Sequence, residues 1–167
     1  DYDLTSLKSC YAGSASSPIP LKEKILKSFP NGKLYDPFGQ SEMSPVTTCL
    51  LPEDSLRKNN SVGKPIANVE IRIVDEEMND VPLGEIGEVV YRGPTLMKEY
   101  YKNPEATEEA FRGGWFHSGD LVRMDDEGFI YIVDRKKDMI ISGGENIYPV
   151  EIENHLYEHP DIQECAV

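Results

Sequence analysis

Two short stretches of this chain place carboxylates beside glycine and hydroxyl side chains, a combination suited to binding a nucleotide. The first is YDPFGQSE, residues 35–42. There Phe38 could stack on a flat ring, and Gly39 would let a ligand approach the backbone closely. Ser41 could donate to a phosphate oxygen, and Glu42 offers the hard oxygens that Mg²⁺ prefers. The alternative interpretation is an ordinary surface turn with a packed aromatic ring and a solvated carboxylate.

The second stretch is WFHSGDL, residues 115–121. Asp120 follows a glycine at the mouth of a predicted strand, where its carboxylate could accept hydrogen bonds from both hydroxyls of a ribose. The alternative is an aspartate that only satisfies a tight turn. Trp115 and His117 are interpreted as structural residues.

Composition limits the class of protein. The chain has 167 residues and a formal net charge of −13, enough for about one average domain and too acidic to favour a nucleic-acid partner. Its three cysteines lie far apart and form no Cys-x-x-Cys pair, which favours a reducing compartment over a disulfide framework. No apolar run approaches the length that spans a bilayer. We therefore expect a cytoplasmic protein with weak or no membrane association.

The first sixty residues have the pattern of strands around one helix. LKSCYAGSAS predicts a strand that runs into a small-residue turn, and PIPLKEKILKSF predicts a helix entered through Pro18 and Pro20. The expected buried face of this helix consists of Leu21, Ile25, Leu26 and Phe29. KLYDPFGQSE then predicts a short strand and loop, VTTCLL another strand, and residues 52–65 a polar loop.

Beyond residue 60 the pattern changes to short β-rich runs, namely NVEIRIVD, GEVVYRG, GDLVRMD and FIYIVD. Strands of this spacing predict a small antiparallel barrel or sandwich. Between them, PTLMKEYYKNPEATEEAF predicts a helix in two pieces broken near Pro104. A charged connector, RKKD, then leads to an expected hairpin at Gly143 and Gly144 and to a helix with Pro149 in its first turn. We place a domain boundary at residues 135–138.

Both ends of the chain look cut. It starts without an initiator methionine and stops at IQECAV, which reads as the beginning of a strand. We therefore expect a fragment of a longer protein, whose cut strand edges favour dimerisation.

The motifs occur in a fixed order: YDPFGQSE, PEAT, GWFHSGDL, GFIYIVDRKKDMI and GGENIYPVEIE. This order strongly resembles the adenylate-forming superfamily of acyl-CoA synthetases, adenylation domains and luciferases, over nearly the whole chain. The resemblance implies an α+β fragment of the adenylate-forming fold. Its expected parts are the end of an α/β subdomain (1–60), a small antiparallel β-barrel subdomain (61–134), and the hinge with the truncated start of a mobile α+β C-terminal domain (135–167).

The resemblance also implies ligands and residue roles. Enzymes of this superfamily join a small-molecule carboxylic acid to AMP using ATP and Mg²⁺, then pass the acyl group to a thiol, usually that of coenzyme A. By position, Asp36 is expected to meet the adenine amino group, Asp120 to hold the ribose, and Glu42 to bind Mg²⁺. Ser41 and Glu42 are expected to support catalysis. The full set expected at AMP or ATP is Gly13, Ser14, Ala15, Asp36, Phe38, Gly39, Ser41, Asp120, Ile132, Arg135 and Asn146.

Three further residues match positions that act when the acyl group moves to coenzyme A. Lys137 matches the hinge about which the small domain swings. Gly143 and Gly144 match the hairpin that lines the pantetheine tunnel, where side chains would block the path. One departure from the family pattern is Pro37, which stands where many members have glycine.

The parent protein is expected to be a fatty-acid–CoA ligase, with an aryl-acid CoA ligase or a carrier-protein adenylation domain as alternatives. The family's phosphate loop ending in Pro-Lys-Gly and its late catalytic lysine are not found in these 167 residues. The isolated chain is therefore expected to be inactive, because such cations and donors stabilise the transferred phosphoryl group. An alternative of another class is a non-catalytic fragment that binds nucleotide weakly or serves in assembly.

Overall fold

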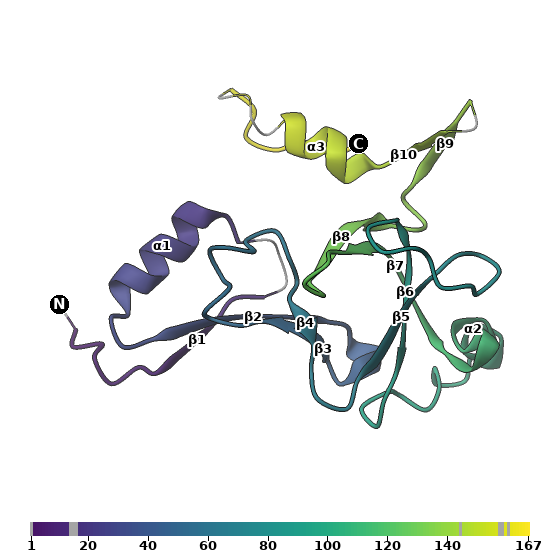
Figure 1. The fold of residues 1–167 in the computed structure, drawn as a ribbon, viewed down its shortest axis with the longest axis horizontal. Helices are drawn as coiled ribbons and strands as arrows, with labels where there is room; N and C mark the ends of the chain where they lie inside the picture. The colour runs from purple at the N-terminus through teal and green to yellow at the C-terminus, as the bar shows by residue number, and fades with distance from the viewer. Residues whose placement is uncertain (1, 14–16, 144, 157–158, 160) are drawn as a thin grey trace.

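The computed structural model describes residues 2–13, 17–143, 145–156, 159 and 161–167. Strands within these residues form a sheet of order β1-β2-β3-β4, a sheet of order β5-β6-β7-β8, and a hairpin of β9 and β10 (Figure 1). Short helices accompany the sheets, which confirms the α+β class. Among the described residues, no helix combines the length and apolarity that a membrane crossing requires.

The first sheet places the YDPFGQSE motif between two neighbouring strands. It contains β1 (Ser9–Tyr11), β2 (Lys33–Gly39), β3 (Val46–Leu50) and β4 (Lys64–Pro65). Strand β2 pairs in parallel with β1 and antiparallel with β3. Pro37 lies in β2 beyond the residues that pair with β1, so the missing N–H of proline removes no bond from that ladder. The strand is therefore longer than predicted, and the motif begins inside it.

Helix α1 (Ile19–Ser28) packs against β2 and begins directly after Pro18, as predicted. Its expected buried face is partly wrong. Leu21 is 45% exposed, whereas the neighbouring Lys22 is only 1% exposed. The reason is a tertiary ion pair, because the Lys22 ammonium meets Asp36 of β2. A buried charge with a partner can replace an apolar side chain that periodicity alone would place inside.

The second sheet is an antiparallel meander of β5 (Glu70–Val74), β6 (Gly87–Arg92), β7 (Phe116–Met124) and β8 (Ile130–Arg135). The small antiparallel barrel predicted here is not closed, because β5 and β8 lie at opposite edges of this sheet. An isolated bridge between Gly63 and Ile130 instead joins the chain before β4 to β8. The buried core lies on this sheet and includes Met43, Val69, Ile73, Val89, Tyr91, Phe116, Val122 and Ile130.

The helical prediction between the strands holds only for its second piece. Helix α2 (Pro104–Ala110) begins at an Asn103 cap that accepts a hydrogen bond from the Ala106 N–H, as the sequence suggested. Residues 95–102 form turns and bends instead of a helix. There the Met97 N–H donates to the Glu42 carbonyl at 2.7 Å, and this tertiary bond replaces an intrahelical one. The short helical turns η1 (Ser41–Met43) and η2 (Arg112–Gly114) flank β2 and β7.

The C-terminal part contains β9 (Ile140–Ser142), β10 (Glu145–Ile147) and α3 (Pro149–Leu156). The pairing of Ser142 with Glu145 confirms the predicted hairpin. The Val150 N–H of α3 donates to Asp134 of β8 at 3.2 Å, and Figure 1 shows α3 beyond the edge of the second sheet. The prediction that a strand begins at IQECAV is wrong in this structure, because no strand forms in residues 161–167. The structure describes no neighbouring strand with which these residues pair.

Candidate functional site

Strand register brings Asp120 and Arg135 together. The two residues are direct partners where β7 pairs with β8, and the Arg135 Nε lies 3.0 Å from the Asp120 Oδ1. Asp120 is only 4% exposed, whereas the Arg135 side chain is half exposed. A buried carboxylate is thus paired with a half-exposed cation at the end of the sheet.

The charge of Asp120 is held in an unfavourable environment. Burial raises the pKa of Asp120 to about 6; Arg135 opposes this rise, and the charges of Glu88 and Glu42 add to it. Glu42, from a distant part of the sequence, is therefore close enough to act on Asp120 electrostatically. Strongly perturbed carboxylates of this kind are typical of functional sites. Neutral donors such as two sugar hydroxyls would stabilise the ionised form.

Glu42 is held by a residue that sequence reasoning did not identify. The Tyr100 hydroxyl donates to the Glu42 Oε1 at 2.9 Å. Burial, the hydrogen bond to Glu42 and the charge of Glu42 raise the pKa of Tyr100 to about 12, so the phenol stays protonated and keeps donating. A single oriented carboxylate fits Mg²⁺, which is commonly bound by one or two carboxylates together with substrate phosphates. No sequence signal marked Tyr100, because its contact depends on the non-helical path of residues 95–102.

Asp36 meets Lys22 from helix α1. The Lys22 Nζ lies 2.5 Å from the Asp36 Oδ2 and donates to the carbonyl of Ser55 at 3.1 Å. The other oxygen, Oδ1, is buried and has no hydrogen-bond partner in the described structure. Since buried polar atoms are nearly always satisfied, this orphaned acceptor fits a missing donor such as the amino group of adenine.

The glycines expected at the nucleotide are explained in part by the chain itself. A Cβ on Gly39 would lie 1.9 Å from the Pro45 carbonyl oxygen, so close packing of β2 on the next segment requires glycine there. A Cβ on Gly13 would lie 3.2 Å from the Pro37 carbonyl oxygen. The small-residue turn and the YDPFGQSE motif are therefore neighbours in space, as the resemblance implied. Ser14 and Ala15 lie outside the described residues.

A second buried carboxylate, Glu88 of β6, contacts the residues next to Asp120 and Arg135. Its Oε1 accepts from the Gly119 N–H at 3.1 Å, and its Oε2 lies 3.3 Å from the Lys136 Nζ and 3.1 Å from the His117 Nδ1. Burial alone would raise the pKa of Glu88, but the hydrogen bond with His117 and the charges of His117 and Lys136 lower it below its ordinary value. Glu88 thus fixes the residues directly before Asp120 and after Arg135.

Ile132, Lys137, Gly143 and Asn146 have other surroundings. Ile132 of β8 packs against the buried core cluster. Lys137 and Asn146 are exposed, and Gly143 has a φ of +63° with no atom within 4 Å of an added Cβ. None of these three makes a described hydrogen bond or ion pair with Asp120 or Glu42. Gly144 lies outside the described residues. The β9–β10 hairpin is a separate two-stranded sheet that pairs with neither four-stranded sheet (Figure 1).

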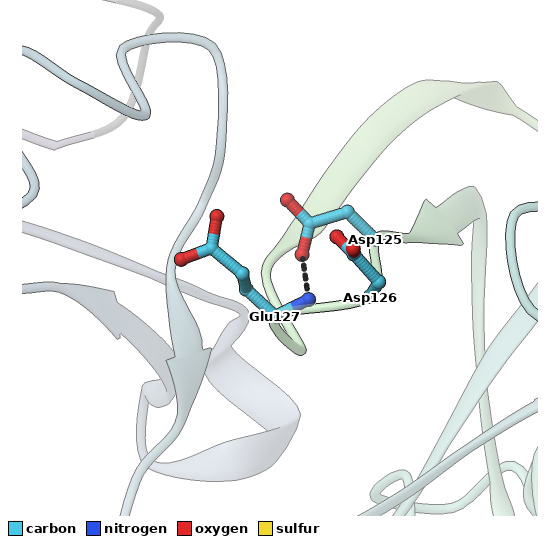
Figure 2. Close-up of side chains that lie close together, drawn as sticks. All are labelled: Asp125, Asp126 and Glu127. Carbon is cyan, nitrogen blue, oxygen red and sulfur yellow. Dashed lines mark hydrogen bonds between the residues drawn. The ribbon is translucent and has the colours of Figure 1, made fainter.

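One other acidic cluster has the composition of a cation site. Asp125, Asp126 and Glu127 lie together in the turn between β7 and β8 (Figure 2). The Glu127 N–H donates to the Asp125 Oδ1 at 3.0 Å, and the Lys58 Nζ lies 2.7 Å from Asp125 and 2.6 Å from Glu127. Arg57 also pairs with Glu127 at 2.8 Å. These two cations pair with Asp125 and Glu127, and we interpret the contacts as a link between the 52–63 loop and the second sheet.

Comparisons with known proteins agree with this geometry. The family model for AMP-binding enzymes matches residues 1–101. A long-chain-fatty-acid–CoA ligase from Bacillus subtilis is 46% identical over 99% of this chain and 30% of its own length. A feruloyl-CoA synthase from Amycolatopsis is 43% identical over 99% of this chain and 33% of its own length. The chain thus spans about a third of the length of the curated relatives it matches.

Solved structures of the family share this fold. The o-succinylbenzoate CoA synthetase of Bacillus subtilis, in complex with an acyl-adenylate intermediate, superposes with a TM-score of 0.85 at 38% identity, over 96% of this chain and 32% of that one. The same enzyme in complex with ATP and magnesium ion superposes with a TM-score of 0.81 at 36% identity, over 96% of this chain and 35% of that one. The relatives are CoA ligases, and the chain belongs to the family of AMP-binding, adenylate-forming enzymes.

Proposed function

We propose that the protein containing this chain is an AMP-forming acyl-CoA synthetase that acts on a fatty acid. The observation that carries the proposal is the buried Asp120, paired with Arg135 and within electrostatic reach of Glu42. Binding of Mg–ATP requires a carboxylate for the ribose diol, proposed to be Asp120, and a carboxylate for the metal, proposed to be Glu42. The identity to a long-chain-fatty-acid–CoA ligase favours a fatty acid. The identity to a feruloyl-CoA synthase keeps an aryl acid as the second candidate.

The roles proposed for the residues are those that the family resemblance implies, and the chemistry of each side chain suits its role. Asp36 accepts a hydrogen bond from the adenine amino group, and Asp120 accepts from both ribose hydroxyls. Ser41 donates to a phosphate oxygen. Glu42 holds Mg²⁺, which when bound neutralises charge on the phosphates. Arg135, half exposed beside Asp120, contacts the ribose and phosphate.

The proposed reaction has two steps. A carboxylate oxygen attacks the α-phosphorus of ATP, the bond from that phosphorus to the bridging oxygen breaks, and pyrophosphate leaves with the bonding electrons. The small C-terminal domain, whose hinge and first part are residues 135–167, then turns about Lys137. This rotation brings the β9–β10 hairpin to the site. A thiolate attacks the acyl carbon and AMP leaves with its oxygen. Gly143 and Gly144 line the path of the thiol, and Asn146 approaches AMP in that arrangement.

The test is ATP–pyrophosphate exchange by the full-length protein with a panel of fatty, cinnamic and benzoic acids. We expect exchange that depends on the acid and is fastest with a fatty acid. Asp120→Asn should reduce exchange by about a hundredfold, the scale of losing one important polar contact. Asp126→Asn, at an exposed position in the neighbouring turn, is the matched control and should exchange normally. Absence of exchange with every acid would contradict the proposal.

A further inference from the structure

We infer that Lys22 is a positioning residue that presents one oxygen of Asp36 to a purine amino group, and that the pair selects 6-aminopurine over 6-oxopurine nucleotides. The inference rests on the proposed function, since it assumes that the nucleotide base lies at Asp36. It goes further by naming a residue on a different element, helix α1, and a specificity that this residue controls.

The contacts of Lys22 leave its ammonium no freedom. The side chain is almost fully buried, and its Nζ is 2.5 Å from the Asp36 Oδ2, 3.1 Å from the Ser55 carbonyl oxygen and 3.5 Å from the Asn59 carbonyl oxygen. An ammonium has three donors, and three acceptors from separate parts of the chain are in place for them. Burial of a lysine ammonium is costly without such partners, so the charge and the orientation of Lys22 depend on these three acceptors.

The consequence for Asp36 is that its two oxygens have different roles. Oδ2 is occupied by Lys22, whereas Oδ1 is buried and has no partner among the described residues. Rotation of the carboxylate would break the contact with Lys22, so Oδ1 is fixed as an acceptor. The turn at Gly13 lies against the Pro37 carbonyl, directly after Asp36. The residue directly after Asp36 thus contacts the other segment expected to enclose the base.

A fixed acceptor discriminates between bases by what they present at position 6. The amino group of adenine donates to Oδ1. A 6-oxopurine presents an oxygen at this position, which is another acceptor. The Asp36 Oδ1 and the purine O6 would then face each other without a proton to share, and sites built on hydrogen bonds reject such a mismatch strongly. Without Lys22, the carboxylate is free to rotate, and the discrimination should be lost.

The experiment is a calorimetric titration of the full-length protein with AMP and with IMP. We expect the wild-type protein to bind AMP at least about tenfold more tightly than IMP, the scale of one hydrogen bond to a charged group. Lys22→Met should reduce this ratio to less than about threefold. Lys22→Arg should preserve part of it, because the charge remains. Lys24→Met, at an exposed position on the same helix, should bind like the wild type.

The outcomes separate this inference from the proposed function. If the wild type binds neither nucleotide, the proposed nucleotide site itself is wrong. If it binds both equally, or if Lys22→Met keeps the full ratio, nucleotide binding stands and the role of Lys22 is overturned. If Lys22→Met does not fold, Asp36→Asn decides: its amide can both donate and accept, so the ratio should fall, and a ratio that stays at the wild-type value contradicts the inference.

Discussion

Asp120 and Glu42 are carboxylates that the chain supports in different ways. Glu42 receives a hydrogen bond from the Tyr100 hydroxyl, whereas the side chain of Asp120 has a single cationic partner, Arg135, and is otherwise enclosed. Burial thus raises the pKa of Asp120 to about 6 and makes the charged form, which would hold a sugar diol, less favourable than it is in water. A buried carboxylate with few partners lowers the stability of the folded protein. Such carboxylates are typical of binding sites, where the ligand supplies the missing hydrogen-bond donors.

The stability of the protein should therefore depend on the titration of Asp120. Its folded-state pKa, about 6, is above the ordinary value of 3.8. The folded state binds this proton more tightly than the unfolded state does. The contribution of Asp120 to the free energy of unfolding is therefore fully present below pH ~4 and is lost as pH rises through ~6. Asp120→Asn should remove this loss and gain about 3 kcal/mol relative to wild type between pH 4 and pH 7, while binding AMP more weakly.

Urea unfolding of both full-length proteins at several pH values measures this difference. Every other titrating group is common to the two proteins and cancels in the comparison. A difference in unfolding free energy that stayed constant from pH 4 to pH 7 would mean that burial does not perturb Asp120 as described.

At the scale of elements, strand β6 positions the ends of β7 and β8 through one side chain. Glu88 holds the Gly119 N–H and the Lys136 ammonium, which flank Asp120 and Arg135. Glu88→Gln should keep the packing, weaken the contact with Lys136, and loosen the Asp120–Arg135 pair. We expect weaker AMP binding and a loss of stability of about 1 kcal/mol or more at neutral pH.

The pH dependence of that loss is the specific readout. The pKa of Glu88 is below its ordinary value of 4.5, so its stabilising contribution is present above that pH and is lost as pH falls through the folded-state pKa. The difference between Glu88→Gln and wild type should therefore shrink in acid. Glu85→Gln, at an exposed position before β6, serves as the control and should show no such change.

The junction of β2 with the following segment makes a separate prediction about packing. Gly39→Ala would place a methyl group 1.9 Å from the Pro45 carbonyl oxygen, so the strand must shift. We expect a loss of about 3 kcal/mol or more without any ligand present, the upper end of overpacking costs, because the clash is with backbone. Gly84→Ala, which has a φ of +90° but no atom within 4 Å of the added carbon, should lose only the ~1–2 kcal/mol of the left-handed conformation. Thermal unfolding of the two variants compares these costs, and equal losses would contradict the packing argument.

At the scale of the whole molecule, the phosphate loop and the late lysine that the resemblance leads us to expect are not found in these 167 residues. We predict that the isolated 167-residue chain catalyses ATP–pyrophosphate exchange at least about a hundredfold more slowly than the full-length protein. Weak AMP binding by the same chain would still agree with the geometry of Asp120. Acid-dependent turnover by the isolated chain at the full-length rate would refute the prediction.

The same sample tests the alternative of a non-catalytic assembly module. Strands β1, β4, β5 and β8 are at the edges of their sheets within the described residues, and open edges favour pairing between chains. Light scattering over a range of concentrations should show self-association of the isolated chain. A strict monomer at every concentration would rule out assembly through these edges.

The sequence by itself determined the α+β class, the β9–β10 hairpin, the start of α1 and the cap of α2, because each depends on local pattern and on Pro, Gly or Asn at fixed positions. It also determined the family, because the motifs occur in a fixed order. It could not reveal that residues 95–102 leave the helical path, since the bond from Met97 to Glu42 joins segments far apart in the chain.

Only the tertiary structure decided which polar residues are buried together. Lys22 and Glu88 have the sequence context of ordinary surface charges, and Tyr100 that of an ordinary half-buried ring. Each becomes part of the site because its partner, respectively Asp36, Lys136 and Glu42, arrives from a distant element. The open sheet in place of a barrel has the same cause. Edge pairing and buried charge depend on the relative placement of whole elements, which local periodicity does not encode.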